Sequence, residues 1–472
     1  MNRSSELLVN DVHSLQNATR VADMVFPRSV AEIQAAIADA AARGLPLAIC
    51  GGRHAMGGQQ FGEGALLLDM RGMDRIIAFD DIEGLIEVEA GIEWPALIDY
   101  LEAAPQRGPR WSIRQKQTGA DTLSLGGCLS SNVHGRGLTM QPFIADVEAF
   151  TLIDADGIVH LCSRACNRSL FGLAIGGYGM FGVIASVTLR LAPRRKMRRD
   201  VTLLGIDELL PAFDQRIAAG YAYGDFQFAI DPDSADFLQR GVFSCYVPVD
   251  DATPIGDDDK QLSENDWRRL LCLAHTAKTA AFECYAAHYL ATDGQVYWSD
   301  RLQQSTYLAG YHHEIDGVLG YCGAEMIGEI YVPRASLAGF MREAAADFRK
   351  HAVDLIYGTI RLIERDGESF LPWAKQDYAC VIFNLHTALT PDGIEATARA
   401  FRRLIDMAIA RNGSYYLTYS KAASARQVRA CHPNFDRFLD AKRRLDPQQR
   451  FQSNWYRHYR DLLAAAPAEL AA

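Results

Sequence analysis

The sequence predicts an α+β protein that is built from more than one domain. Its 472 residues exceed the length that a single hydrophobic core usually serves. Short apolar strands and amphipathic helices are mixed along the chain, and three glycine-rich loops flanked by strands lie in its first half. Longer strands and helices follow from about residue 196, which indicates a second domain.

The first elements alternate between helix and strand. Residues 27–43 predict a helix, because Ser29 and Glu32 form a capping box, apolar side chains recur at helical spacing, and Gly44 ends the segment. A helix is also predicted at 93–104, with Pro95 near its first turn. Apolar runs predict strands at 45–50, 65–70, 75–79 and 84–91.

The rest of the first half is predicted to be a hairpin and a closing strand. Residues 147–163 form two apolar runs joined at 154–157, and residues 183–193 form the last strand. Pro193 and the basic run at 194–199 mark the boundary between the domains.

The second half combines strands with helices. Strands are predicted within 328–334 and 380–387, and helices at 335–352 and 391–413, where Asn412-Gly413 gives a usual C-terminal signal. A final helix is predicted within 436–451.

Composition excludes several classes of protein. The net charge of −10 argues against a general nucleic-acid-binding role, which needs clustered Lys and Arg. The ten cysteines form no CxxC pair, so no metal site is expected, and free thiols suit a reducing cytoplasm. Residues 169–189 carry no charge, but five glycines favour a buried loop and a strand there over a membrane span. A soluble, cytoplasmic protein is therefore expected.

The three glycine loops span residues 51–58, 119–135 and 176–182. In the third, Gly177, Gly179 and Gly182 match the GxGxxG dinucleotide fingerprint. The fingerprint needs a helix after it and an acidic residue about 20 positions on, whereas a strand and basic residues follow here, so a Rossmann site is excluded. One long cofactor that touches all three loops is the simplest common explanation. The first loop taken alone also allows a solvated loop histidine, His54.

The loops resemble a known family. GGRHAMGG, TGADTLSLGGCLSSNVHG and GGYGMFGVI occur in the order and spacing of the FAD-binding domain of the vanillyl-alcohol-oxidase (PCMH-type) family, over about residues 20–195. The remaining chain resembles the branch of decaprenylphosphoryl-ribose oxidase, alditol oxidase and the aldonolactone oxidases. That likeness rests on EIYVPR at 329–334, CVIF at 380–383, YLTYSKAAS at 416–424 and the segment 432–456.

The resemblance implies an α+β fold with a PCMH-type two-part FAD-binding domain and an antiparallel-sheet substrate (cap) domain. The FAD-binding domain would comprise residues 1–195, the cap domain 196–434, and a C-terminal return to the FAD domain 435–472. The active site would lie between the two domains.

The resemblance also implies the residues that bind FAD. His54 matches the histidine that many members link covalently to the flavin, which favours covalent FAD. Ala120 stands where some relatives carry a second, cysteine link. His134 matches a histidine beside the flavin, although a histidine held by backbone groups is the alternative. The implied FAD-binding residues are Gly51, Gly52, Arg53, His54, Ala55, Met56, Gly57, Gly119, Thr122, Ser124, Gly126, Gly127, Asn132, His134, Gly135, Gly177, Gly182, Val183, Ile184 and Lys421.

The implied catalytic residues are Lys421, His134, Glu329 and Arg361. Lys421 falls where the branch places an active-site lysine, and a desolvated lysine is able to take the proton of an alcohol. A solvated Lys421 and a surface ion pair of Glu329 with Arg334 are the alternatives. The implied substrate pocket includes Tyr331, Cys380 and Asn384.

The predicted function is FAD-dependent oxidation of an alcohol carbon on a small sugar, polyol or aldonolactone-like molecule. Hydride would move to flavin N5, and oxygen would reoxidise the flavin. Gly119 favours an oxidase, because by alignment it leaves space at the flavin edge where oxygen reacts. Three alternatives stay open: a dehydrogenase that passes electrons to a quinone or another carrier, a flavin-dependent C=C reductase, and a flavin-binding protein without activity.

Overall fold

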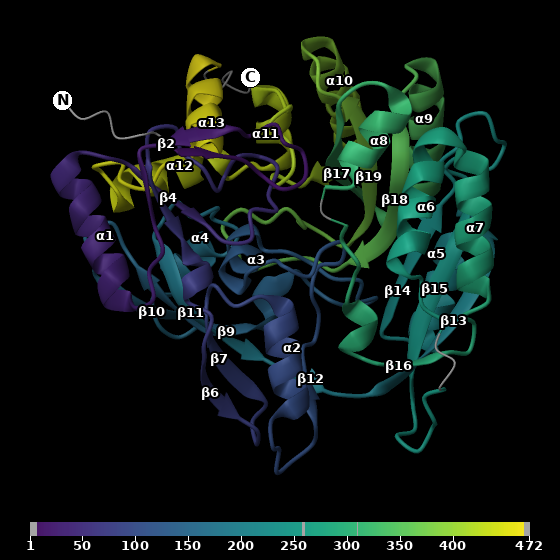
Figure 1. Cartoon of the computed structure of the whole chain (residues 1–472), viewed down its shortest axis with the longest axis horizontal. Coiled ribbons are helices and arrows are strands. Elements are labelled where there is room, and N and C mark those ends of the chain that lie inside the picture. The colour runs from purple at the N-terminus through teal and green to yellow at the C-terminus, as the bar shows by residue number, and fades with distance from the viewer. Residues whose placement is uncertain (1–6, 257–259, 309, 467–472) are drawn as a thin grey trace.

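The computed structural model describes residues 7–256, 260–308 and 310–466. Within those residues, helices and mainly antiparallel sheets form two adjoining bodies (Figure 1). The first body contains the N-terminal half of the chain and the second contains its middle (Figure 1). The predicted α+β class is confirmed.

Two sheets form the first body. A three-stranded parallel sheet has the order β3-β5-β4, and a five-stranded antiparallel sheet has the order β10-β9-β11-β7-β6. Their strands are β3 (Asp23–Val25), β4 (Leu47–Cys50), β5 (Leu66–Asp69), β6 (Ile76–Asp80), β7 (Leu85–Glu89), β9 (Val147–Ile153), β10 (Val159–Ser163) and β11 (Val183–Arg190). The predicted 147–163 hairpin is the β9–β10 pair.

Helices and two small strand pairs complete this body. The predicted first helix is α1, where the Ser29 side chain accepts from the Glu32 backbone N–H and Gly44 ends the helix in a left-handed conformation. The elements are α1 (Val30–Arg43), α2 (Trp94–Ala103), α3 (Leu125–Ser131), α4 (Arg168–Ala174), the 3₁₀ helices η1 (Met70–Gly72) and η2 (Phe143–Asp146), and the pairs β1 (Leu7–Val9) with β2 (Thr19–Val21) and β8 (Trp111–Ser112) with β12 (Ala192–Pro193).

An eight-stranded antiparallel sheet forms the second body. Its order is β16-β13-β15-β14-β18-β19-β17-β20. The strands are β13 (Lys196–Gly205), β14 (Tyr223–Phe228), β15 (Arg240–Val249), β16 (Val296–Trp298), β17 (Gly323–Pro333), β18 (Leu355–Ile363), β19 (Tyr378–Ala388) and β20 (Ser414–Tyr415).

Helices cover the two faces of this sheet unequally. On one face, α5 (Ile206–Ala218), α9 (Leu337–Lys350) and α10 (Pro391–Ile409) bury alternate apolar side chains of the strands. On the other, α6 (Glu264–Thr276) and α7 (Lys278–Leu290) lie over only part of the sheet. We call the uncovered remainder, formed by β14, β18, β19 and β17, the open face. The remaining elements are α8 (His312–Leu319), η3 (Arg301–Gln303) and η4 (Arg334–Ser336).

The C-terminal segment returns to the first body (Figure 1). It contains α11 (Ala425–Cys431), α12 (Phe435–Leu445) and α13 (Asn454–Ala465). Phe451 pairs in parallel with Leu47 at the edge of β4, and the Asn454 backbone N–H donates to the Phe61 carbonyl at 2.7 Å. Figure 1 accordingly draws the yellow C-terminal helices beside the purple N-terminal strands.

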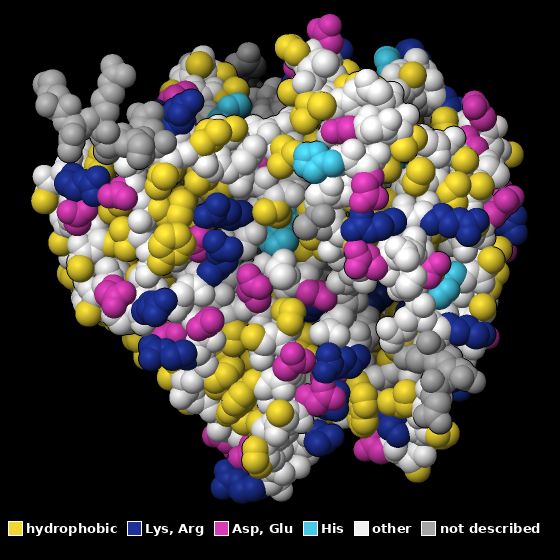
Figure 2. Space-filling view, in the orientation of Figure 1, with side chains coloured by type: hydrophobic (Ala, Val, Ile, Leu, Met, Phe, Trp, Pro, Cys, Tyr) yellow, Lys and Arg dark blue, Asp and Glu magenta, His cyan; other side chains and the backbone are white. Residues whose placement is uncertain are grey.

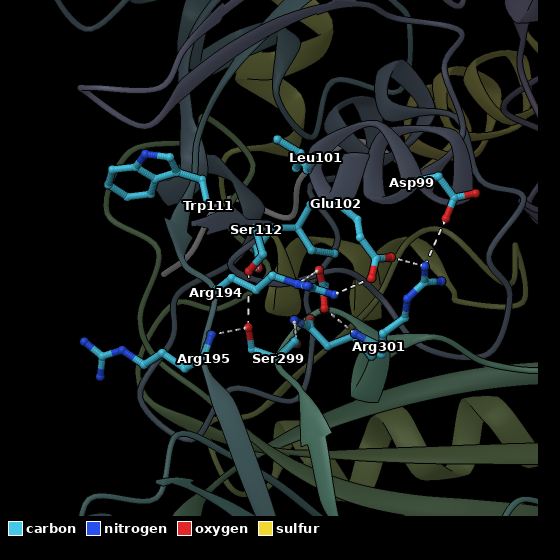
Figure 3. A network of polar contacts seen from close by, with 12 residues as sticks. Asp99, Leu101, Glu102, Trp111, Ser112, Arg194, Arg195, Ser299 and Arg301 are labelled. Atoms are coloured by element: carbon cyan, nitrogen blue, oxygen red, sulfur yellow. Dashed lines mark hydrogen bonds and ion pairs between the residues drawn. The ribbon is translucent and has the colours of Figure 1, made fainter. Parts of the chain in front are cut away.

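A buried ion-pair network joins the two bodies where the sequence predicted a boundary (Figure 3). Arg194 Nε contacts Asp300 at 2.8 Å, and both side chains are almost fully buried. Arg194 also reaches Glu102 at the end of α2, at 3.1 Å, and Arg301 binds the same carboxylate. Ser112 and Ser299 share a 3.2 Å hydrogen bond beside it. The connection between the bodies is therefore fixed by buried contacts.

The structure tests three predictions about the loops and helices of the first body. β11 and not a helix follows Gly182, as the exclusion of a Rossmann site required. Helices α3 and α4 lie in glycine- and serine-rich stretches where only loops were predicted, because tertiary packing of Leu125, Leu129 and Phe171 outweighs poor helix propensity. No helix in the described ranges combines the length and apolar character of a membrane span.

The described surface in Figure 2 carries no large patch of one charge. Basic and acidic side chains alternate over that face, interrupted by small hydrophobic areas.

Candidate functional site

A cavity of about 1170 Å³ joins all three glycine loops to the open face of the sheet. Side chains of α6 and α7 and the segment 304–308 complete its wall. The predicted site residues that line it are Gly51, Gly52, Arg53, His54, Ala55, Gly119, Ser124, Gly126, Gly127, His134, Gly182, Ile184, Glu329, Arg361 and Asn384. Residues from both halves of the chain thus share one space.

The first two loops require glycine because they pack on each other. A Cβ at Gly51 would overlap the Ser124 side chain, and a Cβ at Gly52 would overlap the Thr122 carbonyl oxygen. These two glycines therefore serve loop–loop packing, and both also line the cavity. Arg53, at φ +60°, donates to the fully buried Asp69 at 2.9 Å and anchors the loop on β5.

Other glycines expose backbone to the cavity. Gly119 has φ +109° and nothing within 4 Å of a built Cβ, and Gly179 has φ +74° with only Ile49 nearby, at 3.7 Å. Backbone in this left-handed region strains any other residue type. Bare backbone on the second and third loops along one cavity of about 1170 Å³ fits a dinucleotide-sized flavin cofactor, whose phosphates and flat rings need such access.

His54 is held in a defined tautomer at the cavity wall. Its Nε2 lies 3.0 Å from the Thr122 carbonyl oxygen, which only accepts, so Nε2 carries the hydrogen. Its Nδ1 then accepts from His13 Nε2 at 2.9 Å. Burial lowers the pKa of His54 to about 4, so the ring is neutral at neutral pH with a lone pair on Nδ1. Tyr307 packs edge-on against both rings.

A buried hydrogen-bond cluster occupies the open face opposite the loops. Glu329 Oε2 accepts from His134 Nε2 at 3.0 Å and from the Tyr331 hydroxyl at 2.7 Å, and Oε1 accepts from the Tyr419 hydroxyl at 3.2 Å. His134 Nδ1 donates to the Gly135 carbonyl at 2.9 Å. Both nitrogens of His134 thus face acceptors, so one proton is shared between His134 and Glu329.

The charge of this cluster follows from its surroundings. Burial acts to raise the pKa of Glu329, but His134, the Tyr331 hydroxyl and Arg361 lower it below its ordinary value. Glu329 therefore stays ionised inside the cavity. Arg361 is itself buried and donates to Thr118, which directly precedes the second loop. Its Nε has no protein partner among the described residues. The alternative of a surface ion pair is wrong, since Arg334 instead donates to the Ile363 carbonyl.

Three possible metal ligands meet within this cluster. One ligand atom each of His134, Glu329 and Cys380 lies within 4.8 Å of the others. Burial raises the pKa of the Cys380 thiol well above its ordinary value, so the metal-binding thiolate is disfavoured. Hydrogen bonds already use the other two groups, so the cluster works as a proton-sharing network.

Lys421 lies apart from the cavity wall. A Cβ built on Gly58 would lie 3.2 Å from Lys421 Nζ and 2.9 Å from Asn17 Oδ1, so the amine points to the turn after the first loop. Burial lowers its pKa, and Asp11 opposes that shift. This placement gives no direct support to a role in binding FAD or in catalysis, because Tyr419 lines the cavity whereas the Lys421 amine lies beside Gly58.

Several other predicted residues support the wall from behind. Tyr331 and Cys380 contact Glu329 but do not line the cavity, and Asn132 ends α3 and bonds Asp366 at 2.9 Å. The remaining predicted residues outside the wall are Met56, Gly57, Thr122, Gly135, Gly177 and Val183. They shape the loops whose neighbours reach the cavity.

The predictions missed several polar residues of the wall. Among them are Glu325, Tyr357, Tyr416, Tyr419 and Arg136. The alternation of Glu325, Ile327 and Glu329 along β17 was a usable signal, because residues two apart on a strand share a face. The positions of Tyr419 and Arg136 had no such signal.

Comparisons with known proteins agree with the cavity's chemistry. Residues 22–163 match the family described as FAD binding domain. The chain is 32% identical over 180 residues to an uncharacterized oxidoreductase of the fasciation locus of Rhodococcoides fascians, covering 38% of this chain and 40% of the relative. It is 29% identical over 209 residues to L-gulono-1,4-lactone dehydrogenase of Mycobacterium tuberculosis, covering 43% and 46%.

A longer but weaker match involves cytokinin dehydrogenase 1 of Oryza sativa subsp. japonica, 27% identical over 476 aligned positions that cover 91% of this chain and 85% of the relative. The matches with the first relatives span less than half of those proteins' lengths. Together these matches confirm the predicted resemblance to the FAD-linked oxidoreductases of the PCMH-type superfamily and support FAD as the cofactor.

Proposed function

We propose that this FAD-linked chain oxidises an alcohol carbon of a sugar-, polyol- or aldonolactone-like molecule. One observation carries the proposal: a single cavity joins the three glycine loops to the Glu329 cluster. When bound, FAD supplies the acceptor for the hydride. The name of one relative, a lactone dehydrogenase, agrees with a sugar-derived substrate.

The proposed site activates the alcohol with a carboxylate and a guanidinium. Among the described residues, Glu329 Oε1 accepts only from the Tyr419 hydroxyl, at 3.2 Å, so it is the acceptor best placed to take a hydrogen bond from a substrate hydroxyl. Arg361, whose Nε lacks a protein partner in the described chain, donates to the same substrate oxygen. Withdrawing the O–H proton makes the adjacent C–H a better hydride donor, and such help is typically worth about 10²–10⁴ in rate.

His134 shares a proton with Glu329 and so sets the net charge of the proposed site. Its Nε2 shares a proton with Glu329 Oε2, and its Nδ1 is fixed by the Gly135 carbonyl. When a second proton arrives at Oε1, the pair becomes cationic and stabilises negative charge nearby. His134 and Glu329 thus take the role that the sequence analysis assigned to Lys421.

The cofactor link through His54 belongs to the same proposal. The ring of His54 is neutral, and its Nδ1, which accepts from His13 Nε2 at the cavity wall, would provide the lone pair for the link once that hydrogen bond is released. Reoxidation by oxygen is also proposed, since nothing lies within 4 Å of a built Cβ at Gly119. Transfer to a quinone-type carrier is the second candidate, because the names of two relatives are those of dehydrogenases.

The proposal is tested with purified holoenzyme under anaerobic conditions. Polyols, sugars and lactones are added in turn, and bleaching of the visible flavin band is followed. Rapid bleaching by at least one of them is expected. A flavin that stays oxidised with every member of the panel would refute alcohol oxidation, and protein that retains no flavin would refute the FAD-dependent activity itself.

A further inference from the structure

The cavity has a second polar position far from the Glu329 cluster. Glu325 and Glu329 both point to the open face of β17, four residues apart, which corresponds to about 13 Å along a strand. Ile327 lies between them on the same face. A substrate atom at Glu329 therefore leaves Glu325 free to contact another part of the same molecule.

Glu325 is a buried carboxyl group with one protein partner. It is only 8% exposed, and its Oε2 accepts from Asn384 Nδ2 at 2.9 Å. No ion pair to Glu325 occurs among the described residues. Burial raises its pKa to about 7, and the hydrogen bond from Asn384 opposes the rise.

Asn384 adds a buried acceptor that has no donor among the described residues. The side chain is also 8% exposed, and its Oδ1 has no hydrogen-bond partner in the part of the chain that the structure describes. Its amide is committed to Glu325, so Oδ1 and Glu325 Oε1 are adjacent acceptors on the cavity wall. A buried acceptor without a donor costs free energy, and native proteins rarely leave one such as Asn384 Oδ1 without a partner.

Neighbouring groups of the protein do not complete the pair. His386, which faces Glu325 across the strands, leans towards Gly323, and burial lowers its pKa so that it stays neutral. Lys278 is paired with Asp354 at 2.7 Å. The cavity beside the pair is formed by apolar and aromatic side chains, including Ile327, Ile356, Tyr357 and Leu271.

We propose that Glu325 and Asn384 form a substrate subsite for a nitrogen group with two N–H donors, such as an ammonium or amidinium, carried on an apolar skeleton. Two adjacent acceptors match such a group better than a single hydroxyl, which donates once, and a cation bound beside Glu325 favours the ionised form of its carboxyl group. The inference rests on the proposed function in that it makes the substrate an alcohol that also bears a basic nitrogen. The nitrogen would bind at Glu325, and the reacting carbon would lie towards Glu329.

The test uses the oxidised holoenzyme and measures binding by calorimetry, so no turnover is needed. Benzamidine provides the two N–H donors on an apolar ring, and methyl benzoate provides the ring without them. Benzamidine is expected to bind at least about tenfold more tightly than methyl benzoate. Glu325→Gln keeps the size of the side chain and should weaken benzamidine binding at least about tenfold.

A matched control separates the subsite from general charge effects. Glu395→Gln removes a carboxylate from the exposed side of α10, and benzamidine affinity should stay within about twofold of the wild-type value. Asn384→Leu removes the second acceptor and should weaken benzamidine while sparing methyl benzoate. The thermal transition of each variant shows whether it is folded.

Two outcomes would overturn the subsite: benzamidine that binds Glu325→Gln as tightly as wild type, or no binding to wild type below about 10 mM. These outcomes differ from a failure of the proposed function. A flavin that no alcohol reduces would remove alcohol oxidation but would leave an intact benzamidine site, and loss of the benzamidine site would leave reduction of the flavin by simple polyols possible.

Discussion

Replacing Glu329 with glutamine is the sharpest change that the site allows. The side chain keeps its shape but loses its negative charge. Oε2 accepts from both His134, at 3.0 Å, and Tyr331, at 2.7 Å, so the amide oxygen of the new side chain must take that position. The amide nitrogen then occupies the Oε1 position, beside Tyr419 and the cavity. The substitution thus turns the acceptor that faces the substrate into a donor.

The expected result is a folded, flavin-loaded protein that reduces slowly. Loss of proton acceptance should lower the rate of anaerobic flavin reduction by at least about 10², the lower end for acid–base help. Stability should change by no more than about 2 kcal/mol, because the lost charge-assisted bonds are offset by relief from burying a charge.

The assay is stopped-flow mixing of oxidised protein with a saturating alcohol, followed in the visible flavin band. Tyr331→Phe is the matched control, because it removes a hydrogen bond to the same carboxylate from behind the cavity wall. It should lower the rate by less than about tenfold. A Glu329→Gln variant that reduces its flavin within about threefold of wild type would refute the role of Glu329 as acceptor.

The same contacts support four further predictions. After acid precipitation, flavin should stay in the wild-type pellet and leave the His54→Ala pellet; free flavin in wild type would contradict a covalent link. The Lys421→Met variant should reduce its flavin at a rate within about threefold of wild type, and a rate lower by about 10² or more would restore the catalytic role of Lys421. The pKa of Glu325 in the folded protein, about 7, exceeds its ordinary value of 4.5, so the free energy of unfolding should fall as pH rises through that window, by at most roughly 3 kcal/mol. Glu325→Gln, which leaves the neighbouring His386 and Tyr357 in place, should abolish that loss. Thermal melts of both proteins at about pH 5 and about pH 8 measure it. Photoreduced protein should reoxidise within seconds in air-saturated buffer, whereas reaction over minutes with faster quinone reduction would indicate a dehydrogenase; Gly119→Ala is unsuited to this test, because φ +109° strains alanine.

The sequence alone determined the class of the fold and predicted which loops would border the cavity. Spacing and caps located α1, the β9–β10 hairpin and β11, because local hydrogen bonds and alternation fix such elements. The glycine loops predicted one long ligand, and all three do border one cavity. The order of the loops in the chain was enough for this prediction, because positions whose backbone must be free of a side chain appear in the sequence as glycine.

Tertiary structure decided which side chains enter the cavity and in what chemical state. Lys421 and Tyr419 are two residues apart, yet Tyr419 lines the cavity whereas the Lys421 amine lies beside Gly58. The charge of Glu329 depends on His134, which lies 195 positions away in the sequence, and the pKa of Glu325 depends on burial beside Asn384. Burial and long-range pairing set electrostatic free energies, and neither is encoded in local sequence.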